Sequence, residues 1–195
     1  FETGIENPLD AAVVAAGEGA GLTTEGFLKI DELPYDFQRR RLTMVVADGG
    51  DPASHIIVTK GAFDNVLTCC DTVDAGGKTT PLDPAISAGL EVIFAAKGQA
   101  GFRVLALATR AIAARASYAR EDERGMTFRG FLVFHDPPRP DAAKTIEALG
   151  DLGVRIKVIS GDNQHVTAHL ARIIGLDPAA MLTGQQLASL TDEAL

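Results

Sequence analysis

The chain has 195 residues, 46% of them hydrophobic, and a formal net charge of -8. This length is enough for one large domain or two small ones. The negative charge argues against a nucleic-acid partner, because a polyanion requires a basic surface on the protein that binds it. No stretch approaches the roughly 18 uninterrupted apolar residues of a membrane span, and no signal peptide begins at Phe1, so we expect a soluble cytosolic module.

Residues 1–127 are expected to form a mixed α/β domain. Asn7 can cap a helix that Pro8 opens. The turn-rich sequence Asp-Gly-Gly-Asp-Pro at 48–52 separates two apolar runs and predicts a β-hairpin. In chain order, the expected elements are a helix at 8–16, a strand at 28–33, hairpin strands at 41–47 and 55–59, a helix at 63–70, a small excursion at 73–82, a helix at 84–97 and a strand around 103.

Two further segments of this domain have a simple interpretation. Cys69 and Cys70 are the two cysteines of the chain and lie near the end of the expected helix 63–70. Neighbouring cysteines rarely form a disulfide with each other, and these two lack metal-ligand partners at a useful spacing, so we expect reduced thiols. The polar run 116–125 alternates basic and acidic residues and is expected to be a surface loop.

From residue 128 onward the pattern changes to an alternation of strands and helices. Apolar residues at Ala142, Ile146 and Leu149 follow the helical period, and Gly153 is expected to end that helix. In chain order, the expected elements are a strand at 131–134, a helix at 141–152, a strand at 155–159 and a helix after Asp162 that ends at Gly175, with Pro178 beyond it. Two strands joined by a helix pair in parallel, so the loops after both strands should open on one edge of the sheet, where ligands bind.

The loops at these two strand ends carry the most informative residues. One contains Asp136, followed by two prolines, and the other is Ser-Gly-Asp-Asn at 160–163. Gly161 allows a tight turn with positive φ, and Ser160 or Asp162 can cap the next helix, whose amino end favours anions. A carboxylate beside a phosphate requires a divalent cation between them, so the two loops predict a phosphate and magnesium site. By itself, the second loop is more simply described as an ordinary turn between a strand and a helix.

Candidate residues for a nucleotide base lie in the first domain. A flat base needs an aromatic face and a carboxylate or amide for its exocyclic amine, which Phe37 and Asp10 could supply. Taken singly, Phe37 is more simply interpreted as a core residue.

Three basic residues could bind a triphosphate, namely Arg39, Lys60 and Arg103. Lys60 lies between an apolar strand and Gly61, where backbone can approach a ligand closely. Arg103 lies inside an apolar strand, and a charged side chain at such a position requires either a ligand or an ion-pair partner. Arg39 belongs to a run of three arginines, 39–41, which also fits a solvated charged surface.

The motifs together resemble those of the P-type ATPases, the phosphoenzyme cation pumps. In chain order they are Asn-Pro-Leu-Asp at 7–10, Phe37 before the arginine triplet, Lys-Gly-Ala at 60–62, Phe-Arg-Val-Leu-Ala-Leu-Ala at 102–108, Asp-Pro-Pro-Arg at 136–139 and Ser-Gly-Asp-Asn at 160–163. Ser160 stands where most members have threonine, which keeps the hydroxyl. The resemblance implies that Asp10 faces the adenine, Phe37 stacks on it and Arg103 reaches the phosphates.

The resemblance also implies a domain organisation. Residues 1–127 would form the nucleotide-binding domain, an antiparallel sheet with helices. Residues 128–195 would form an incomplete part of the phosphorylation domain, a Rossmann-like parallel α/β fold of the haloacid-dehalogenase type. Asp136, Ser160, Gly161 and Asp162 would surround the phosphate and magnesium, although we assign no certain metal ligand.

The family's nucleophile is the aspartate of an Asp-Lys-Thr-Gly motif, which does not occur in these 195 residues. We expect it upstream of Phe1, and a later magnesium motif beyond Leu195. The chain alone is therefore expected to bind ATP without hydrolysing it.

The sequence at 34–46 resembles the bacterial magnesium-importing ATPases most, whereas calcium and proton pumps usually differ around the arginine triplet. The resemblance implies ATP and Mg²⁺ as cofactors. It also implies the rest of the same pump as partner, including its transmembrane and actuator domains and the missing part of the phosphorylation domain. The whole protein would lie in the bacterial inner membrane, with this portion in the cytoplasm. The alternatives are a non-catalytic nucleotide-sensing module, another P-type subtype such as a calcium or proton pump, and a free-standing phosphatase, which would need its own nucleophilic aspartate.

Overall fold

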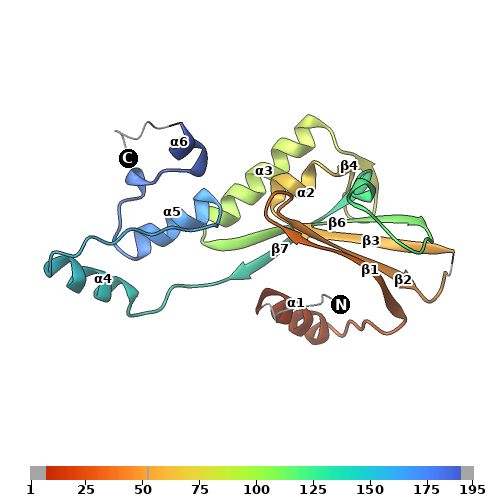
Figure 1. The fold of residues 1–195 in the computed structure, drawn as a ribbon, viewed down its shortest axis with the longest axis horizontal. Coiled ribbons are helices and arrows are strands. Elements are labelled where there is room, and N and C mark those ends of the chain that lie inside the picture. The colour runs from red at the N-terminus through yellow and green to blue at the C-terminus, as the bar shows by residue number, and fades with distance from the viewer. Residues whose placement is uncertain (1–7, 52, 190–195) are drawn as a thin grey trace. The chain divides into compact units, whose positions relative to one another are not determined.

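The computed structural model describes residues 8–51 and 53–189 (Figure 1). They fall into two compact units. The first comprises the described residues up to 88 together with 104–132, and the second comprises 89–103 together with the described residues from 133 onward. Segment 89–103 thus belongs with the C-terminal residues, which the sequence did not suggest. The domain boundary after residue 127 stays a prediction.

A mixed sheet supports the first unit. In the described residues it has seven strands, in the spatial order β1-β2-β3-β6-β7-β4-β5. The strands are β1 (Phe27–Asp36), β2 (Arg41–Asp48), β3 (Ser54–Gly61), β4 (Cys70–Asp74), β5 (Thr79–Pro81), β6 (Phe102–Ala113) and β7 (Met126–His135). The β1–β2, β2–β3, β3–β6 and β4–β5 pairs are antiparallel, whereas β4 and β7 are parallel. This mixed α/β architecture and the hairpin of β2 and β3 confirm the prediction, whereas the parallel pair of β4 and β7 departs from the antiparallel sheet that was expected.

The core of the first unit combines aliphatic residues of the sheet with a group of phenylalanines. Successive residues of β3 alternate between buried and half-buried, as expected for a strand with one face on the core. Phe63 begins α2 (Phe63–Leu67), and its ring lies 6.3 Å from that of Phe128 and 5.4 Å from that of Phe131, both in β7. These contacts attach α2 to β7 through tilted and edge-to-face ring pairs, which are favourable arrangements for aromatic side chains.

The helices of the first part differ from the prediction in extent. α1 (Pro8–Gly19) begins at the predicted proline and runs beyond Ala16, and the proposed cap Asn7 lies outside the described residues. α3 (Pro84–Gln99) matches the expected helix closely. The helix expected to reach Cys70 is wrong at its end, because α2 stops at Leu67 and Cys70 starts β4.

The reason for the short helix is tertiary. Cys70 pairs with Met126 in the parallel ladder of β4 and β7, which requires an extended backbone. Cys69 is buried and Cys70 half-buried, and both are free thiols as expected.

The second unit contains the expected helices. They are α4 (Ala142–Asp151) and α5 (Gln164–Ile173). A further short helix, α6 (Gly184–Ala188), and a 3-10 helix before it, η2 (Pro178–Ala180), were not predicted from the sequence; a second 3-10 helix, η1 (Arg120–Asp122), lies in the first unit. Gly153 and Gly175 follow the ends of α4 and α5 with φ of 80° and 81°, which confirms both predicted helix stops.

The strand predicted at 155–159 is wrong. Residues 154–160 are irregular, and Figure 1 shows them as an open link between α4 and α5. A strand needs a neighbour to bond its backbone groups, and within the described residues none lies beside this segment. Ile159 is accordingly 99% exposed. The predicted parallel pairing of 131–134 with 155–159, and the shared sheet edge derived from it, are therefore absent from the described residues.

Candidate functional site

The first unit brings two predicted nucleotide residues together. Lys60, near the end of β3, forms an ion pair with Asp10 in the first turn of α1, and both side chains are partly exposed. The two residues are 50 positions apart in the sequence. A phosphate that binds Lys60 would therefore compete with Asp10 for the ammonium group.

Phe37 lies on the turn between β1 and β2. Its side chain is 89% exposed, and its ring meets that of Tyr35 edge to face with centroids 5.6 Å apart. The alternative that Phe37 is a core residue is therefore wrong. An exposed aromatic face held on a short turn is suited to stacking on a planar base.

Gly61 allows two backbone segments to meet. A Cβ at this position would lie 2.5 Å from the carbonyl oxygen of Arg40, and the N–H of Ala62 donates to that oxygen at 2.9 Å. Arg40 itself has a positive φ of 50°, which is uncommon for a residue with a side chain. The Lys-Gly-Ala segment thus lies directly against the turn that carries Phe37.

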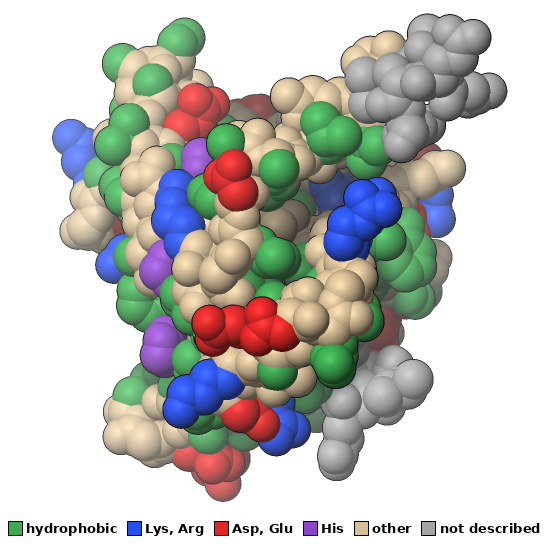
Figure 2. Space-filling view, turned by 90° about the vertical axis from the view of Figure 1, so that its left-hand side faces the viewer, with side chains coloured by type: hydrophobic (Ala, Val, Ile, Leu, Met, Phe, Trp, Pro, Cys, Tyr) green, Lys and Arg blue, Asp and Glu red, His purple; other side chains and the backbone are tan. Residues whose placement is uncertain are grey.

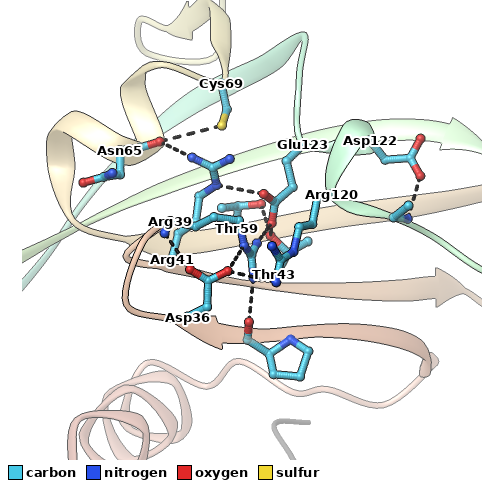
Figure 3. Close-up of polar contacts among 12 residues, drawn as sticks. Asp36, Arg39, Arg41, Thr43, Thr59, Asn65, Cys69, Arg120, Asp122 and Glu123 are labelled. Carbon is cyan, nitrogen blue, oxygen red and sulfur yellow. Dashed lines mark hydrogen bonds and ion pairs between the residues drawn. The ribbon is translucent and has the colours of Figure 1, made fainter.

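Arg39, predicted to contact phosphates, has internal partners instead. Its guanidinium donates to Asp36 Oδ2 at 2.6 Å, to Glu123 Oε1 at 2.5 Å and to the Pro34 carbonyl at 2.6 Å (Figure 3). The side chain is only 11% exposed, so the alternative of a solvated charge run is wrong for Arg39. This arrangement favours a structural role for Arg39 over its predicted role at the phosphates.

Glu123 is a central residue that the sequence did not indicate. It is 4% exposed and accepts hydrogen bonds from Arg39, from Arg41 Nε at 2.8 Å and from Thr43 Oγ1 at 2.6 Å. The prediction of a surface loop at 116–125 is wrong here, because Glu123 and Tyr118 are both buried. Three consecutive arginines imply that carboxylates lie nearby in the fold. No local sequence pattern, however, indicates that the partner of Arg39 is Glu123, which lies 84 positions away.

The network also sets the ionisation of its carboxylates. Burial raises the pKa of Glu123, but hydrogen bonds from Thr43, Arg39 and Arg41 outweigh burial and hold the pKa below its ordinary value. The backbone N–H and the guanidinium of Arg39 lower the pKa of Asp36 to about 2. Both groups are therefore anionic at neutral pH and complement the arginines beside them.

The second unit brings together the residues predicted for the phosphate and magnesium environment. Arg103 Nη2 lies 2.9 Å from Asp162 Oδ1, and Arg103 Nη1 lies 3.9 Å from Asp136. The ion pair considered as an alternative explanation for Arg103 is thus present. Ser160 Oγ donates to Asp162 Oδ2 at 3.2 Å and accepts from the N–H of Asp162 at 3.1 Å.

A cavity of about 130 Å³ lies against these groups. It is lined by Arg103, Asp136 and Asp162, together with His135 and His169. Figure 2 shows basic, acidic and histidine side chains mixed over one face of the molecule, with hydrophobic side chains reaching the surface between them. The cavity thus offers groups of both charge signs to a small ligand.

Two details of the 160–163 loop differ from the prediction. Gly161 does not have a positive φ. The cap of α5 is Asn163, whose side chain accepts from the N–H groups of His165 and Val166 at 3.0 and 3.1 Å. Asn163 directly precedes the first helical residue with an extended backbone, which is the geometry of an N-cap, whereas Ser160 and Asp162 bond to each other.

The described residues contain no cluster of metal-ligating side chains. Among them no group of three or more His, Cys, Asp or Glu side chains could hold a metal. A magnesium ion that arrives with a nucleotide takes most of its ligands from phosphates and water, so one or two carboxylates such as Asp136 and Asp162 are enough. No helix in the described part of the chain is long and apolar enough to span a membrane.

Comparison with known proteins identifies the family. Residues 3–141 match the family model described as "P-type ATPase, cytoplasmic domain N". The whole chain is 34% identical to "Magnesium-transporting ATPase, P-type 1" of Escherichia coli and 35% identical to the protein of the same name from Salmonella typhimurium, and it spans 22% of the length of each. It is 27% identical to "Calcium-transporting ATPase 1" of Yarrowia lipolytica, with 98% of the chain and 21% of that relative covered. The chain belongs to the P-type ATPase family.

Proposed function

We propose that this member of the P-type ATPase family is the ATP-binding portion of a cation-transporting pump, which presents ATP to an aspartate outside these 195 residues. The observation that carries the proposal is the 89% exposed ring of Phe37, on a turn that lies against the backbone of the Lys-Gly-Ala segment. This arrangement offers an aromatic surface for the base and, in Lys60, a cation for the phosphates.

Each unit has a separate role in this proposal. In the first unit, Phe37 stacks on the adenine, Asp10 accepts from its amine, and Lys60 exchanges its ion pair with Asp10 for a phosphate. This exchange is feasible because both partners are partly exposed.

In the second unit, Arg103 contributes positive charge at the phosphate end. Asp136, Ser160, Gly161 and Asp162 supply the environment of the transferred phosphoryl group and its magnesium ion. Preformed charge of this kind provides the electrostatic part of phosphoryl transfer.

The transported ion that we propose is magnesium. Two relatives named as magnesium-transporting ATPases are 34–35% identical over the whole chain, compared with 27% for the calcium-transporting ATPase from Yarrowia lipolytica. The whole protein would lie in the bacterial inner membrane, with this portion on the cytoplasmic side. Its partners would be the transmembrane and actuator domains and the rest of the phosphorylation domain of the same pump.

Nucleotide titration of the isolated chain tests the proposal. We expect ATP to bind, and Phe37→Ala to weaken binding by roughly 1–3 kcal/mol, the range for base stacking on an aromatic ring. Phe27→Ala, at the opposite end of β1, is the matched control and should leave the affinity unchanged. Equal affinity of the wild type and Phe37→Ala would remove the stacking role, and no binding of ATP by the wild type would remove the proposed function.

A second measurement concerns chemistry. Incubation with γ-labelled ATP and magnesium should leave the chain unlabelled, because the Asp-Lys-Thr-Gly sequence of the family's nucleophile does not occur in it. A covalent, hydroxylamine-sensitive label would show that the phosphate acceptor lies within these 195 residues.

A further inference from the structure

The turn between β1 and β2 must keep its shape without much help from Phe37. The ring of Phe37 is largely exposed and meets Tyr35 only edge to face. A stacking surface binds a base tightly only when it is already ordered, because ordering it on binding consumes part of the interaction energy. The backbone of the turn must therefore be held by other contacts.

Part of this support is local. Asp36 Oδ1 accepts from the N–H groups of Gln38 and Arg39 at 2.9 and 2.6 Å, and the Asp36 carbonyl accepts from the N–H of Arg40 at 2.8 Å. The Arg40 carbonyl in turn accepts from the N–H of Ala62 at 2.9 Å. These bonds shape the turn and attach it to the end of β3.

Further support comes from a distant carboxylate. Glu123 accepts from Arg39 on the turn, from Arg41 at the start of β2 and from Thr43 further along β2 (Figure 3). The Thr43 hydroxyl also lies 2.6 Å from that of Thr59 in β3. One buried charge thus connects the turn with β2 and, through the threonines, with β3.

The segment that carries Glu123 is itself anchored at its other end. The Tyr118 hydroxyl lies 2.6 Å from His55 Nδ1, and the N–H of Tyr118 donates to Asp31 Oδ2 at 2.8 Å. Between Tyr118 and Glu123 in the sequence, Arg120 forms an additional ion pair with Asp36, at 3.2 Å, next to the turn. The carboxylate of Glu123 is therefore presented by a fixed segment.

We propose that Glu123 is a positioning residue for nucleotide binding, which holds the turn of residues 37–40 so that Phe37 is ordered before the base arrives. The inference rests on the proposed function of this site. Glu123 is buried and pairs with Arg39 and Arg41, so in this proposal it acts through these arginines.

The test compares two replacements of a carboxylate by its amide. Glu123→Gln keeps the shape of the side chain and removes its charge. Asp74→Asn is the matched control, because Asp74 also pairs with an arginine, Arg129 at 2.8 Å, and lies in β4, away from the turn. Glu123→Gln should weaken ATP binding by about 3- to 30-fold, the range for substitutions coupled to a ligand through packed residues. Asp74→Asn should not change the affinity.

Two readouts separate positioning from a general loss of stability. Titrations are run where both variants are folded by circular dichroism, and the amide resonances of residues 37–40 should shift in Glu123→Gln alone. In the background of Phe37→Ala, the effect of Glu123→Gln should largely disappear, because both changes act on the same contact. Unchanged ATP affinity in folded Glu123→Gln, or full additivity with Phe37→Ala, would overturn the inference.

Adenosine distinguishes positioning of the ring from a direct phosphate role of Arg39. If Glu123 acts through Phe37, Glu123→Gln should lower the affinities for adenosine and for ATP by the same factor. If Arg39 instead contacts a phosphate directly, Glu123→Gln should lower the affinity for ATP alone, and this result would overturn the inference. Should Glu123→Gln fail to fold, Thr43→Val takes its place, because it removes a single donor to Glu123 at nearly constant side-chain volume. A loss of adenosine affinity in Thr43→Val would support the inference, and an unchanged affinity would overturn it. Failure of wild-type ATP binding would instead reject the proposed function.

Discussion

Two arginine ion-pair clusters, one around Glu123 in the first unit and one around Arg103 in the second, differ in their burial. Arg39 and Arg41 converge on Glu123, whose side chain is fully buried and whose oxygens are bonded from three side chains. Arg103, in the second unit, is 35% exposed and pairs with Asp162, which is also partly exposed. Water screens an exposed pair and can replace either partner, whereas a buried charge that loses its partners is left unsolvated.

The difference in burial suits the Glu123 cluster to a structural role and the Arg103 pair to ligand binding. In our proposals, the buried network around Glu123 would hold a turn in one shape, and the exposed pair of Arg103 would exchange Asp162 for a phosphate at little cost. The Lys60–Asp10 pair resembles the pair in the second unit, because both of its side chains are partly exposed. Arginines that are equally prominent in the sequence therefore differ in burial, and we propose that they differ in role accordingly.

The largest effect should come from breaking the buried network. Glu123→Ala should lower the free energy of unfolding by about 3–5 kcal/mol, because the largely buried guanidinium groups of Arg39 and Arg41 lose the carboxylate that they share. Asp162→Ala, which breaks the exposed pair, should cost about 1 kcal/mol or less. Urea denaturation of both variants measures the difference, and similar losses would contradict the distinction between the two regions.

A smaller effect is expected on ligand binding. Lys60→Ala and Arg103→Ala should each weaken ATP by about 1.5–3 kcal/mol, the range for hydrogen bonds to charged groups, and should leave adenosine nearly unchanged. Lys78→Ala, an exposed lysine in the loop between β4 and β5, is the matched control. Equal losses for ATP and adenosine would indicate misfolding or contacts to the base in place of phosphate binding.

Acid should weaken the first unit through its carboxylates. A carboxylate with a lowered folded-state pKa contributes stability above its unfolded pKa and loses it as the pH falls through the folded pKa. For Asp36 this window runs from its ordinary value of 3.8 to about 2, and the loss for Glu123 begins near its ordinary value of 4.5. Denaturation midpoints of Asp36→Asn should fall less steeply with acid than those of the wild type, and parallel curves would contradict the role of Asp36.

The smallest effect concerns a thiol beside the network. Burial raises the pKa of Cys69, and also raises that of Cys70 to about 12, so both should react slowly with iodoacetamide in the folded protein. Cys69 Sγ and Arg41 Nη1 both donate to the carbonyl of Asn65. Glu123→Gln should therefore accelerate labelling of Cys69, as measured by mass spectrometry. An unchanged rate would show that the network does not restrain this segment.

Local signals in the sequence predicted the elements of this protein well. Pro8 starts α1, Gly153 and Gly175 follow helix ends, and the turn-rich segment at 48–52 joins the strands of a hairpin. Each depends on the backbone preferences of one or a few residues, which act wherever the chain places them. The motifs at 60–62 and 136–139 likewise indicated the family, which the comparison confirmed.

Only the tertiary structure decided how these elements combine. Glu123 meets Arg39 from 84 positions away, and Cys70 leaves a helical pattern because Met126 offers it a strand partner. The segment 155–159 has the composition of a strand but stays irregular, because no described strand lies beside it. The sequence by itself determined local conformation and family membership, whereas burial and pairing arise between distant segments and depend on the folded chain.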